Sequence, residues 1–140
     1  MIAGPPLLPP GGEEIVTTGF NKFIGPFYRL PDSSDGGSRF GFIATARHMN
    51  AAGTVHGGML ATFLDVSMSR TARLASRAAS CSTISLSCDF LAPGRLGDSI
   101  ESYVKITRKA RMIVFLSAQA LVGDQLLVTA QGVWKLALAQ

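Results

Sequence analysis

Apolar residues recur every three or four positions in one long stretch of the chain, residues 57 to about 77. Leu60, Phe63, Leu64 and Met68 follow this spacing, and no proline interrupts the stretch. In a helix with 3.6 residues per turn, such residues share one face. The opposite face then carries polar side chains, namely Thr62, Asp65, Ser69, Arg73 and Ser76. The pattern therefore predicts one long amphipathic helix.

Four later segments are rich in β-branched and aromatic residues, which is typical of β-strands. They span residues 81–90, 99–108, 112–122 and 126–138. The connections between them are short and favour antiparallel neighbours. Two further strands, at residues 27–30 and 39–46, flank a cluster of turn-forming residues at 31–37 and predict a hairpin ahead of the helix.

A single domain covering residues 13–140 accounts for these elements. Residues 1–12 hold four prolines and predict a flexible segment before it. A short helix is predicted at residues 13–23, although Thr17, Thr18 and Gly19 disfavour it. With one long helix to cover about six strands, the economical architecture is α+β, an antiparallel sheet curled around a central helix.

Composition narrows the classes of partner. Hydrophobic residues make up 47% of the 140 residues and charged residues 16%, so we expect some apolar surface to enter an oligomer interface. The net charge of +4 favours anionic small ligands, but the basic residues are too scattered to predict a nucleic-acid binder. No apolar stretch approaches the roughly 20 residues of a membrane-spanning helix, and residues 1–12 lack the basic start of a signal peptide.

The two cysteines, Cys81 and Cys88, lie seven positions apart in one predicted strand. Strict alternation would point them to opposite faces, where they cannot form a bridge. Free thiols indicate a reducing compartment and a cytoplasmic location. Together with His48 and His56 they lack the spacing of a metal site, and neither a metal nor a redox cofactor is expected.

The chemically informative stretch is HMNAAGTVHGGMLATFLD, residues 48–65. Gly57 and Gly58 begin the predicted helix, where backbone N–H groups lack intrahelical acceptors and lie at the positive end of the helix dipole. Because glycine has no side chain, a substrate carbonyl can approach this backbone closely. The amides can therefore stabilise an oxyanion, and one such donor is typically worth about 3 kcal/mol of barrier.

Asp65 lies eight residues into the predicted helix, in an otherwise weakly polar run. Inside a cleft, its carboxylate can serve as a general base toward water or as a nucleophile toward a thioester. Taken alone, the residue fits equally well on a solvent-exposed polar stripe with Thr62, Ser69 and Arg73. The pattern by itself leaves both interpretations open.

This stretch resembles the signature of hotdog-fold thioesterases, in particular the phenylacetyl-CoA thioesterase type. The signature is His-x-Asn-x-x-Gly-x-x-His-Gly-Gly followed by an aspartate in the helix. Its fixed positions are matched by His48, Asn50, Gly53, His56, Gly57, Gly58 and Asp65. A second segment, TISLSCDFLAPGRLGDSIE at residues 83–101, is similar to the strand that follows the helix in this family. The resemblance covers roughly residues 23–138.

The resemblance implies hydrolysis of an acyl- or aryl-CoA thioester to the free acid and coenzyme A, with Asp65 as the catalytic carboxylate and the Gly57 amide polarising the carbonyl. It places Asn50 and His56 near the carbonyl or the attacking water, and the Thr83 hydroxyl beside that water. It also implies substrate contacts, some of them from a neighbouring subunit, at Gly58, Ser85, Phe90, Arg108, Lys109, Ala110, Arg111, Met112 and Ile113.

The basic side chains of this last group, Arg108, Lys109 and Arg111, suit the phosphates of coenzyme A. The family often has Gly-Arg inside this turn, whereas this chain has Ala110 before Arg111. A positive φ is therefore not expected at residue 110.

Each of these residues also has a simpler structural interpretation. In this interpretation, His56 marks the entry to a helix, Asn50 forms a turn and Thr83 is an ordinary strand residue. The turn at 108–113 is then a solvated loop, and Arg70, Arg73 and Arg77 form a solvated helix face. At the level of the whole protein, the alternative is a non-catalytic hotdog module that binds acyl-CoA. Hydratases of this fold resemble a different pattern, with aspartate and histidine close together in one loop.

Hotdog domains resemble one another in pairing strands across a two-fold axis, with active sites between subunits. The polar alternation at Ser85 and Ser87 suits such an edge. The resemblance therefore implies a homodimer, and we expect a dimer of dimers.

Overall fold

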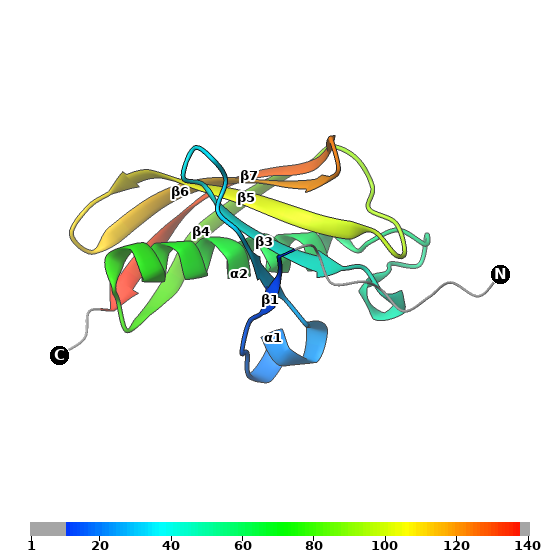
Figure 1. Cartoon of the computed structure of the whole chain (residues 1–140), viewed down its shortest axis with the longest axis horizontal. Helices are drawn as coiled ribbons and strands as arrows, with labels where there is room; N and C mark the ends of the chain where they lie inside the picture. Colours follow the sequence, from blue (N-terminus) through cyan, green and yellow to red (C-terminus); the bar gives the residue numbers. More distant parts are fainter. Residues whose placement is uncertain (1–10, 138–140) are drawn as a thin grey trace.

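The computed structural model describes residues 11–137, in which seven strands accompany one long helix (Figure 1). In chain order the elements are β1 (Glu13–Glu14), α1 (Gly19–Ile24), β2 (Tyr28–Leu30), β3 (Ser38–Ile43), the 3-10 turn η1 (Ala46–His48), α2 (Gly57–Ser76), β4 (Ser80–Phe90), β5 (Ser99–Lys109), β6 (Ile113–Val122) and β7 (Gln125–Ala137). The predicted α+β architecture is confirmed, with one strand more than the six expected.

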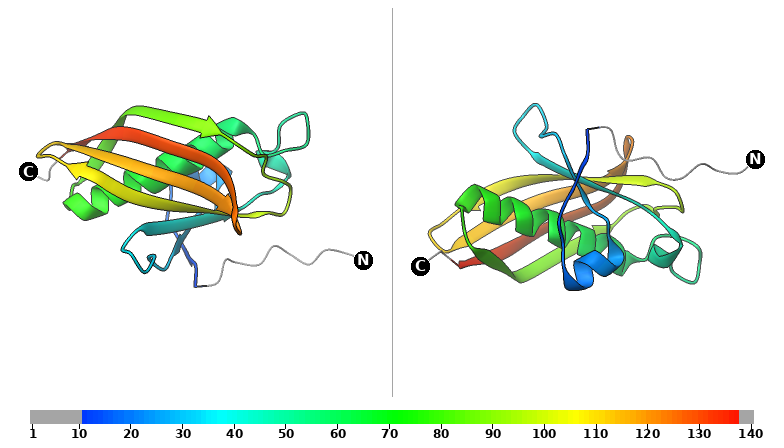
Figure 2. Two further views of the ribbon diagram at one scale, coloured as in Figure 1. Left: turned by 90° about the horizontal axis from the view of Figure 1, so that it is seen from above. Right: turned by 60° about the horizontal axis from the view of Figure 1, so that its bottom comes forward.

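All strands belong to one antiparallel sheet with the order β1-β2-β3-β5-β6-β7-β4. The sheet covers one side of α2, and the short helix α1 lies on the other side of α2 (Figures 1 and 2). Because the chain passes through α2 between β3 and β4, β4 joins the far edge of the sheet rather than the strand before it. Within residues 11–137, this long edge strand pairs only with β7.

The core lies between the apolar face of α2 and the concave face of the sheet. Phe63, Leu64 and Met68 of α2 are completely buried, as the helical spacing predicts. The Phe63 ring packs against Phe27 and Phe42, with ring centroids 6.0 and 4.7 Å away. Each such buried side chain contributes about 1.5–3 kcal/mol relative to an exposed one.

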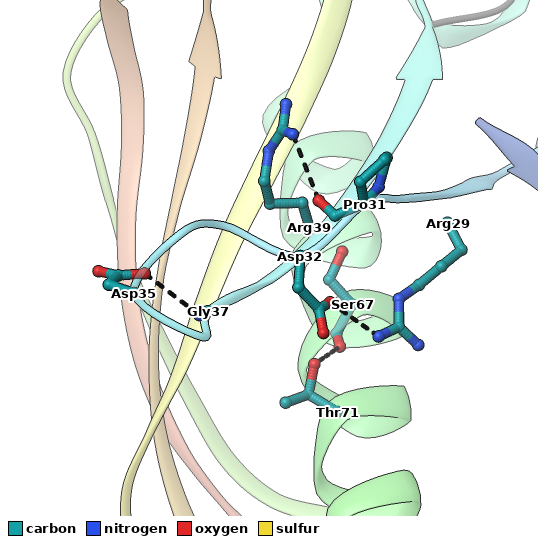
Figure 3. A network of polar contacts seen from close by, with 8 residues as sticks. All are labelled: Arg29, Pro31, Asp32, Asp35, Gly37, Arg39, Ser67 and Thr71. Carbon is teal, nitrogen blue, oxygen red and sulfur yellow. Dashed lines mark hydrogen bonds and ion pairs between the residues drawn. The ribbon is translucent and has the colours of Figure 1, made fainter. Parts of the chain in front are cut away.

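A chain of buried hydroxyl groups fixes α2 against β5. The Ser67 hydroxyl donates to the Phe63 carbonyl (2.8 Å) and accepts from the Ser102 hydroxyl (2.8 Å). One turn later, the Thr71 hydroxyl donates to the Ser67 carbonyl (2.8 Å), as Figure 3 shows. Because every member has a partner, this polar group is accommodated in the core without the cost of an unsatisfied hydroxyl.

The loop of the β2–β3 hairpin is held onto β5 by Asp35. Its carboxylate accepts hydrogen bonds from the Ser33 hydroxyl (2.6 Å), the Gly37 amide (3.2 Å; Figure 3) and the Tyr103 hydroxyl, and it pairs with Lys105 (2.9 Å). These hydrogen bonds, first of all that of Ser33, hold the pKa of Asp35 well below its usual range. A Cβ at Gly37 would overlap the ring of Tyr103, so this approach requires glycine.

The predicted helix at residues 13–23 is wrong in its first half. Residues 13 and 14 form β1, and the Ile15 amide donates to the Phe27 carbonyl (2.8 Å), so this segment is extended beside β2. The helix begins only at Gly19, whose φ of 58° turns the chain after two threonines. The flexible segment expected at residues 1–12 lies mostly outside the described residues, and so does Leu138, the predicted end of the last strand.

A β-bulge in β4 overturns the predicted orientation of the two cysteines. The pairing with β7 shifts between Thr83 and Ser85, which leaves Ile84 as an extra residue. The extra residue restores the same parity on both sides, so Cys81 and Cys88 both pack against the core instead of pointing to opposite faces. Both are free thiols, as expected, because about seven residues of strand still separate them.

Candidate active site

Asp65 lies half-buried in the middle of α2, above the edge strand β4. The Thr83 hydroxyl donates a hydrogen bond to Asp65 Oδ1 over 2.5 Å. Thr83 pairs with the buried Trp134 of β7 in the sheet register and therefore faces the helix. The β-bulge at Ile84 follows directly after Thr83. The bulge and the contact with Asp65 therefore lie at adjacent residues of the edge strand.

Trp134 and Gly132 of the neighbouring strand β7 pack against this part of α2 and β4. The indole N–H of Trp134 donates to the hydroxyl of Ser69, one helical turn after Asp65 (2.7 Å). A Cβ at Gly132 would lie 2.5 Å from the Ser85 carbonyl oxygen and 2.7 Å from the Trp134 ring. Glycine therefore leaves the space that both the bulge and the indole occupy.

A hollow of about 240 Å³ opens beside the Asp65 carboxylate, between α1, α2 and β4; we call it the Asp65 hollow. Its walls include Asn21 of α1, Ser69, Arg70 and Arg73 of α2, and Cys81 of β4. The two arginines, for which a solvated helix face was the simpler interpretation, are half-buried here. Burial, the neighbouring Arg73 and the more distant Arg29 all lower the pKa of Arg70.

None of these five neighbours was identified as a site residue from the sequence, and Ser69 and Asn21 differ in whether the sequence holds a signal for them. Ser69 follows Asp65 by four positions, so helical spacing alone places it on the same stripe. Asn21 lies on a different element and carries no such signal, because only the tertiary packing of α1 brings it to the hollow.

The two glycines at the start of α2 differ in what their amides can do. The Gly58 amide donates to Nδ1 of His56, the N-cap residue, over 2.8 Å. The Gly57 amide has no acceptor among residues 11–137 and remains available. Since Nδ1 of His56 accepts, the proton of the neutral imidazole lies on Nε2, which can donate to a ligand. Both amides were expected to face an oxyanion. Only the Gly57 amide is free to do so among the described residues, because the Gly58 amide is bonded to His56.

Asn50 closes the loop that precedes α2. Its side-chain oxygen accepts from the amides of Ala52 (3.0 Å) and Thr54 (3.1 Å), and its nitrogen donates to the Thr54 hydroxyl (2.9 Å). This is the turn role that was its simpler interpretation.

His48 is buried behind this loop. Its Nδ1 accepts from the Thr45 amide (3.0 Å), so Nε2 carries the proton and donates to the Ile24 carbonyl (2.7 Å). Burial lowers the pKa of this imidazole. His48 thus joins η1 to the end of α1 as a neutral, fully bonded side chain.

Within one chain, Gly57 and Asp65 lie too far apart to act on the same carbonyl. Eight residues of α2 separate them, which corresponds to about 12 Å along the helix axis. The ring of Phe90, 53% exposed, lies 3.4 Å from the place that a Cβ of Gly57 would occupy. Phe90 therefore belongs to the Gly57 end of the molecule and not to the Asp65 hollow.

The basic side chains beside the turn between β5 and β6 lie on both faces of the sheet. A second bulge, between Ile106 and Arg108, pairs Arg108 with the outward-facing Phe115 and Lys109 with the buried Val114. Lys109 Nζ then donates to the Ala75 carbonyl near the end of α2 (3.3 Å), where a cation is favoured by the helix dipole.

At the tip of this turn, the Ala110 amide donates to the Ile113 carbonyl (2.8 Å), and the Leu136 amide donates to the Met112 carbonyl (2.8 Å). Between residues 11 and 137, Arg77 alone among the residues other than glycine has a positive φ. Ala110 therefore lacks one, as predicted. The remaining expected contact, Ser85, pairs with Val133 and faces away from α2 at the exposed edge.

A larger hollow of about 530 Å³ lies on the other flank of α2, between the β2–β3 hairpin and β5. Its charged side chains are already paired: Arg29 with Asp32 (2.9 Å; Figure 3) and Lys105 with Asp35 (2.9 Å). Because these charges satisfy one another, the Asp65 hollow is the better candidate for chemistry.

Neither a metal centre nor a membrane span is found in the part of the chain that the structure describes. Over residues 11–137, no three histidine, cysteine, aspartate or glutamate side chains gather as metal ligands would. In the same range, neither α1 nor α2 has the length and apolar character needed to cross a membrane.

Comparisons with known proteins identify the family of the chain. A model of the Thioesterase superfamily matches residues 52–131, more than half of the chain. PA0474 of Pseudomonas aeruginosa, named as a proposed esterase, is 31% identical over 91 residues, which are 64% of this chain and 68% of that protein.

Solved structures share the fold. A phenylacetic acid degradation-related protein from Ralstonia eutropha JMP134 has a TM-score of 0.67 at 26% identity, over 77% of this chain and 83% of that one. BH2602 of Bacillus halodurans, solved with CoA, has a TM-score of 0.66 at 18% identity, over 79% of this chain and 74% of that one. With its sheet wrapped around a single glycine-led helix and its match to the family over the central region, the chain belongs to the thioesterase superfamily and has the hotdog fold.

Proposed function

We propose that this protein hydrolyses an acyl- or aryl-CoA thioester to the free acid and coenzyme A, with Asp65 as the general base. The observation that carries the proposal is the half-buried Asp65 carboxylate, held by the Thr83 hydroxyl at the wall of a hollow. Membership of the thioesterase superfamily supports the reaction class, and the CoA in the structure of BH2602, which shares the fold, supports the carrier.

In the proposed reaction, Asp65 Oδ2 takes a proton from water while the water oxygen attacks the acyl carbon. The carbonyl oxygen becomes an oxyanion, which the Gly57 N–H stabilises at the positive end of the α2 dipole. When the oxyanion collapses, the carbon–sulfur bond breaks and the proton on Asp65 passes to the thiolate of coenzyme A. The carboxylate is then restored.

A direct attack of Asp65 Oδ2 on the acyl carbon uses the same geometry and would form a mixed anhydride that water then cleaves. Rapid quenching distinguishes the two routes, because only the second passes through a covalently acylated protein. Mass spectrometry of the quenched protein would detect the added acyl group on the peptide that contains Asp65.

The proposal requires a second copy of the chain, since Gly57 and Asp65 of one chain are about 12 Å apart. We propose a homodimer in which the Asp65 of one subunit faces the Gly57 of the other, and a pair of such dimers as the full assembly. The exposed edge strand β4 supports this arrangement because unprotected edges of this length are normally covered. Ile84 and Phe90 leave apolar surface there, at 56% and 53% exposure.

The remaining expected contacts are spread along α2, from its start at Gly57 to the β5–β6 turn beside Ala75. His56 can offer its Nε2 proton to the carbonyl, while Asn50 keeps the loop before the helix in place. Phe90 packs beside Gly57 and offers a surface for the pantetheine arm. Arg108 and Arg111 are the exposed cations of the β5–β6 turn for the phosphates, whereas Lys109 is drawn toward α2. The other residues proposed to contact substrate are Gly58, Ser85, Ala110, Met112 and Ile113.

The test is release of free thiol from a panel of CoA thioesters by the purified protein. Replacing Asp65→Asn should lower kcat by about 10²- to 10⁴-fold, the usual effect of losing a general base. Asp124→Asn, at the exposed tip between β6 and β7, is the matched control and should retain full activity. Tight binding of acyl-CoA with no turnover in the wild type would favour the non-catalytic binding module instead.

Location in the cell is also part of the proposal. The two free thiols, Cys81 and Cys88, suit a reducing cytoplasm.

A further inference from the structure

Among the residues that the structure describes, the lining of the Asp65 hollow has a net positive charge. Arg29 pairs with Asp32 and Arg39 pairs with Glu101, but Arg70 and Arg73 have no carboxylate partner among residues 11–137. Asp65 itself is bonded to Thr83 rather than to either guanidinium. The hollow thus contains two cations against one anion.

Both guanidinium groups belong to the wall of this hollow rather than to the open surface. Arg73 follows Asp65 by two helical turns on the same stripe, and long side chains in helices point back toward the N-terminus, here toward Asp65. Arg73 also lies near Cys81 on β4: burial raises the pKa of that thiol, and the Ser69 hydroxyl and the charge of Arg73 offset part of the rise. Two like charges held together at a half-buried site are costly unless an anion joins them.

The rest of the lining suits a small polar group. Three polar residues, Ser69, Ser80 and Asn21, also line the same hollow. Its volume of about 240 Å³ is below the roughly 300–1,000 Å³ of sites that enclose a drug-sized ligand. By contrast, a hollow of about 380 Å³ beside His56 has mainly apolar walls, including Phe20 and Met59. A long uncharged acyl chain therefore matches the hollow beside His56 better than it matches the Asp65 hollow.

We propose that Arg70 and Arg73 form a subsite that binds a carboxylate at the far end of the acyl group, so that the preferred substrates are CoA thioesters of short dicarboxylic acids. This inference rests on the proposed hydrolysis at Asp65. The planar guanidinium groups bind the carboxylate, and Ser69 and Asn21 supply further hydrogen bonds. The thioester carbonyl then lies next to Asp65, which precedes Arg70 by five residues and Arg73 by eight on α2.

The test compares two thioesters of equal length, glutaryl-CoA and pentanoyl-CoA, which differ in the terminal carboxylate. The wild type should show the higher kcat/KM with glutaryl-CoA. Arg73→Met and Arg70→Met should each lower kcat/KM for glutaryl-CoA by about tenfold or more, the worth of a charge-assisted hydrogen bond, and should lower kcat/KM for pentanoyl-CoA far less. Arg73→Lys should restore part of the loss. Arg95→Met, in an exposed loop, is the control that should change neither substrate.

Pentanoyl-CoA also reports on folding, because a misfolded variant would lose both activities. An equal loss with both thioesters in a variant that retains the wild-type circular dichroism would mean that the arginines bind the phosphates of coenzyme A, and it would overturn the carboxylate subsite. A wild type that prefers pentanoyl-CoA would overturn it as well.

Binding separates this inference from the proposed hydrolysis. In the Asp65→Asn protein, calorimetry should show tighter binding of glutaryl-CoA than of pentanoyl-CoA, and the added Arg73→Met change should remove the difference. If the wild type has no turnover and this preference persists, the hydrolysis proposal fails and the subsite stands. If turnover is present without any preference in rate or binding, the subsite fails and the hydrolysis proposal stands.

Discussion

The Thr83 hydroxyl uses one oxygen of Asp65 and leaves the other open. Oδ1 accepts the Thr83 hydrogen bond, while Oδ2 has no protein donor among the described residues. Thr83→Val keeps the shape of the side chain and removes the donor, so the carboxylate loses its fixed orientation. We expect kcat to fall by about ten- to a hundredfold, since a hydrogen bond to a charged group is worth about 1.5–3 kcal/mol.

Thr83→Ser restores the hydroxyl and should recover most of the activity, which a purely structural role for the β-branched side chain would not explain. Steady-state kinetics on the three proteins checks this prediction. Equal activity of the valine and serine variants would contradict it.

His48 makes stability depend on pH in the slightly acidic range. Burial holds its folded pKa below the ordinary value of 6.5, so the unfolded chain takes up the proton more readily. The free energy of unfolding should therefore be insensitive to His48 above that value and fall as the pH drops through it toward the lower folded pKa. Urea unfolding at about pH 7.5 and pH 5.5 measures this loss.

His48→Gln removes the titrating group while its amide can still donate toward the Ile24 carbonyl. The variant should show a smaller fall in the free energy of unfolding between the same two pH values. An identical fall in both proteins would assign the pH dependence to other groups.

At the residue scale, the sequence identified the carboxylate but not its surroundings. Asp65 and Gly57 stand out because a helix start with two glycines and an isolated aspartate are visible in the chain itself. The environment of Arg73 is not visible there, since Asn21 comes from α1, and Ser80 and Cys81 come from β4. A solvated arginine and one that lines a hollow have the same spacing along a helix.

Among the elements, the edge strand depends on a glycine in its neighbour. Gly132→Ala would place a Cβ 2.5 Å from the Ser85 carbonyl and 2.7 Å from the buried Trp134 ring. Because both are held inside the sheet, the strain should lower the free energy of unfolding by about 1–3 kcal/mol. Gln131→Ala, next to it on the exposed face, should change stability by less than about 0.5 kcal/mol.

Gly132→Ala should also impair catalysis in the fraction that remains folded, because the bulge it displaces carries Thr83. Denaturant unfolding and kcat, measured on the same preparations, test both effects. A destabilised protein with normal kcat would show that the bulge does not position Thr83.

Element boundaries followed from local sequence patterns where the packing is regular. The spacing of apolar residues predicted α2, and the content of β-branched and aromatic residues predicted the four strands after it, to within one or two residues. The bulges at Ile84 and between Ile106 and Arg108 were not predictable, because an extra residue in a strand leaves no mark in residue type. The extended path at Ile15 depends on a partner twelve residues later, so local propensity could not reveal it.

At the scale of the whole molecule, a chain whose catalytic groups lie two turns apart on one helix should be inactive alone and active in pairs. Asp65 lies two turns into α2, whereas Gly57 is its first residue. If each site takes one group from each subunit, two different defects can be separated onto different chains. A mixed dimer then has one site with both defects and one site with neither.

Gly57→Pro supplies the second defect with little change to the fold. Proline lacks the N–H that the proposed oxyanion needs, and it is well tolerated at the first position of a helix. The preceding residue, His56, already has φ −58° and ψ 133°, the extended conformation that a following proline favours. We expect Gly57→Pro and Asp65→Asn each to form a dimer and each to be nearly inactive.

Mixing the two variants under conditions that exchange subunits should restore activity. With random exchange, half of the dimers are mixed and each has one intact site, so the mixture should reach about a quarter of wild-type activity per site. Sedimentation velocity confirms that both variants are dimeric, and mixing either variant with itself is the control. Native mass spectrometry of isotope-labelled chains shows whether the subunits have exchanged. A shared site predicts that two inactive variants recover activity once they exchange. If activity stays absent after exchange, Asp65 and Gly57 do not meet across the interface.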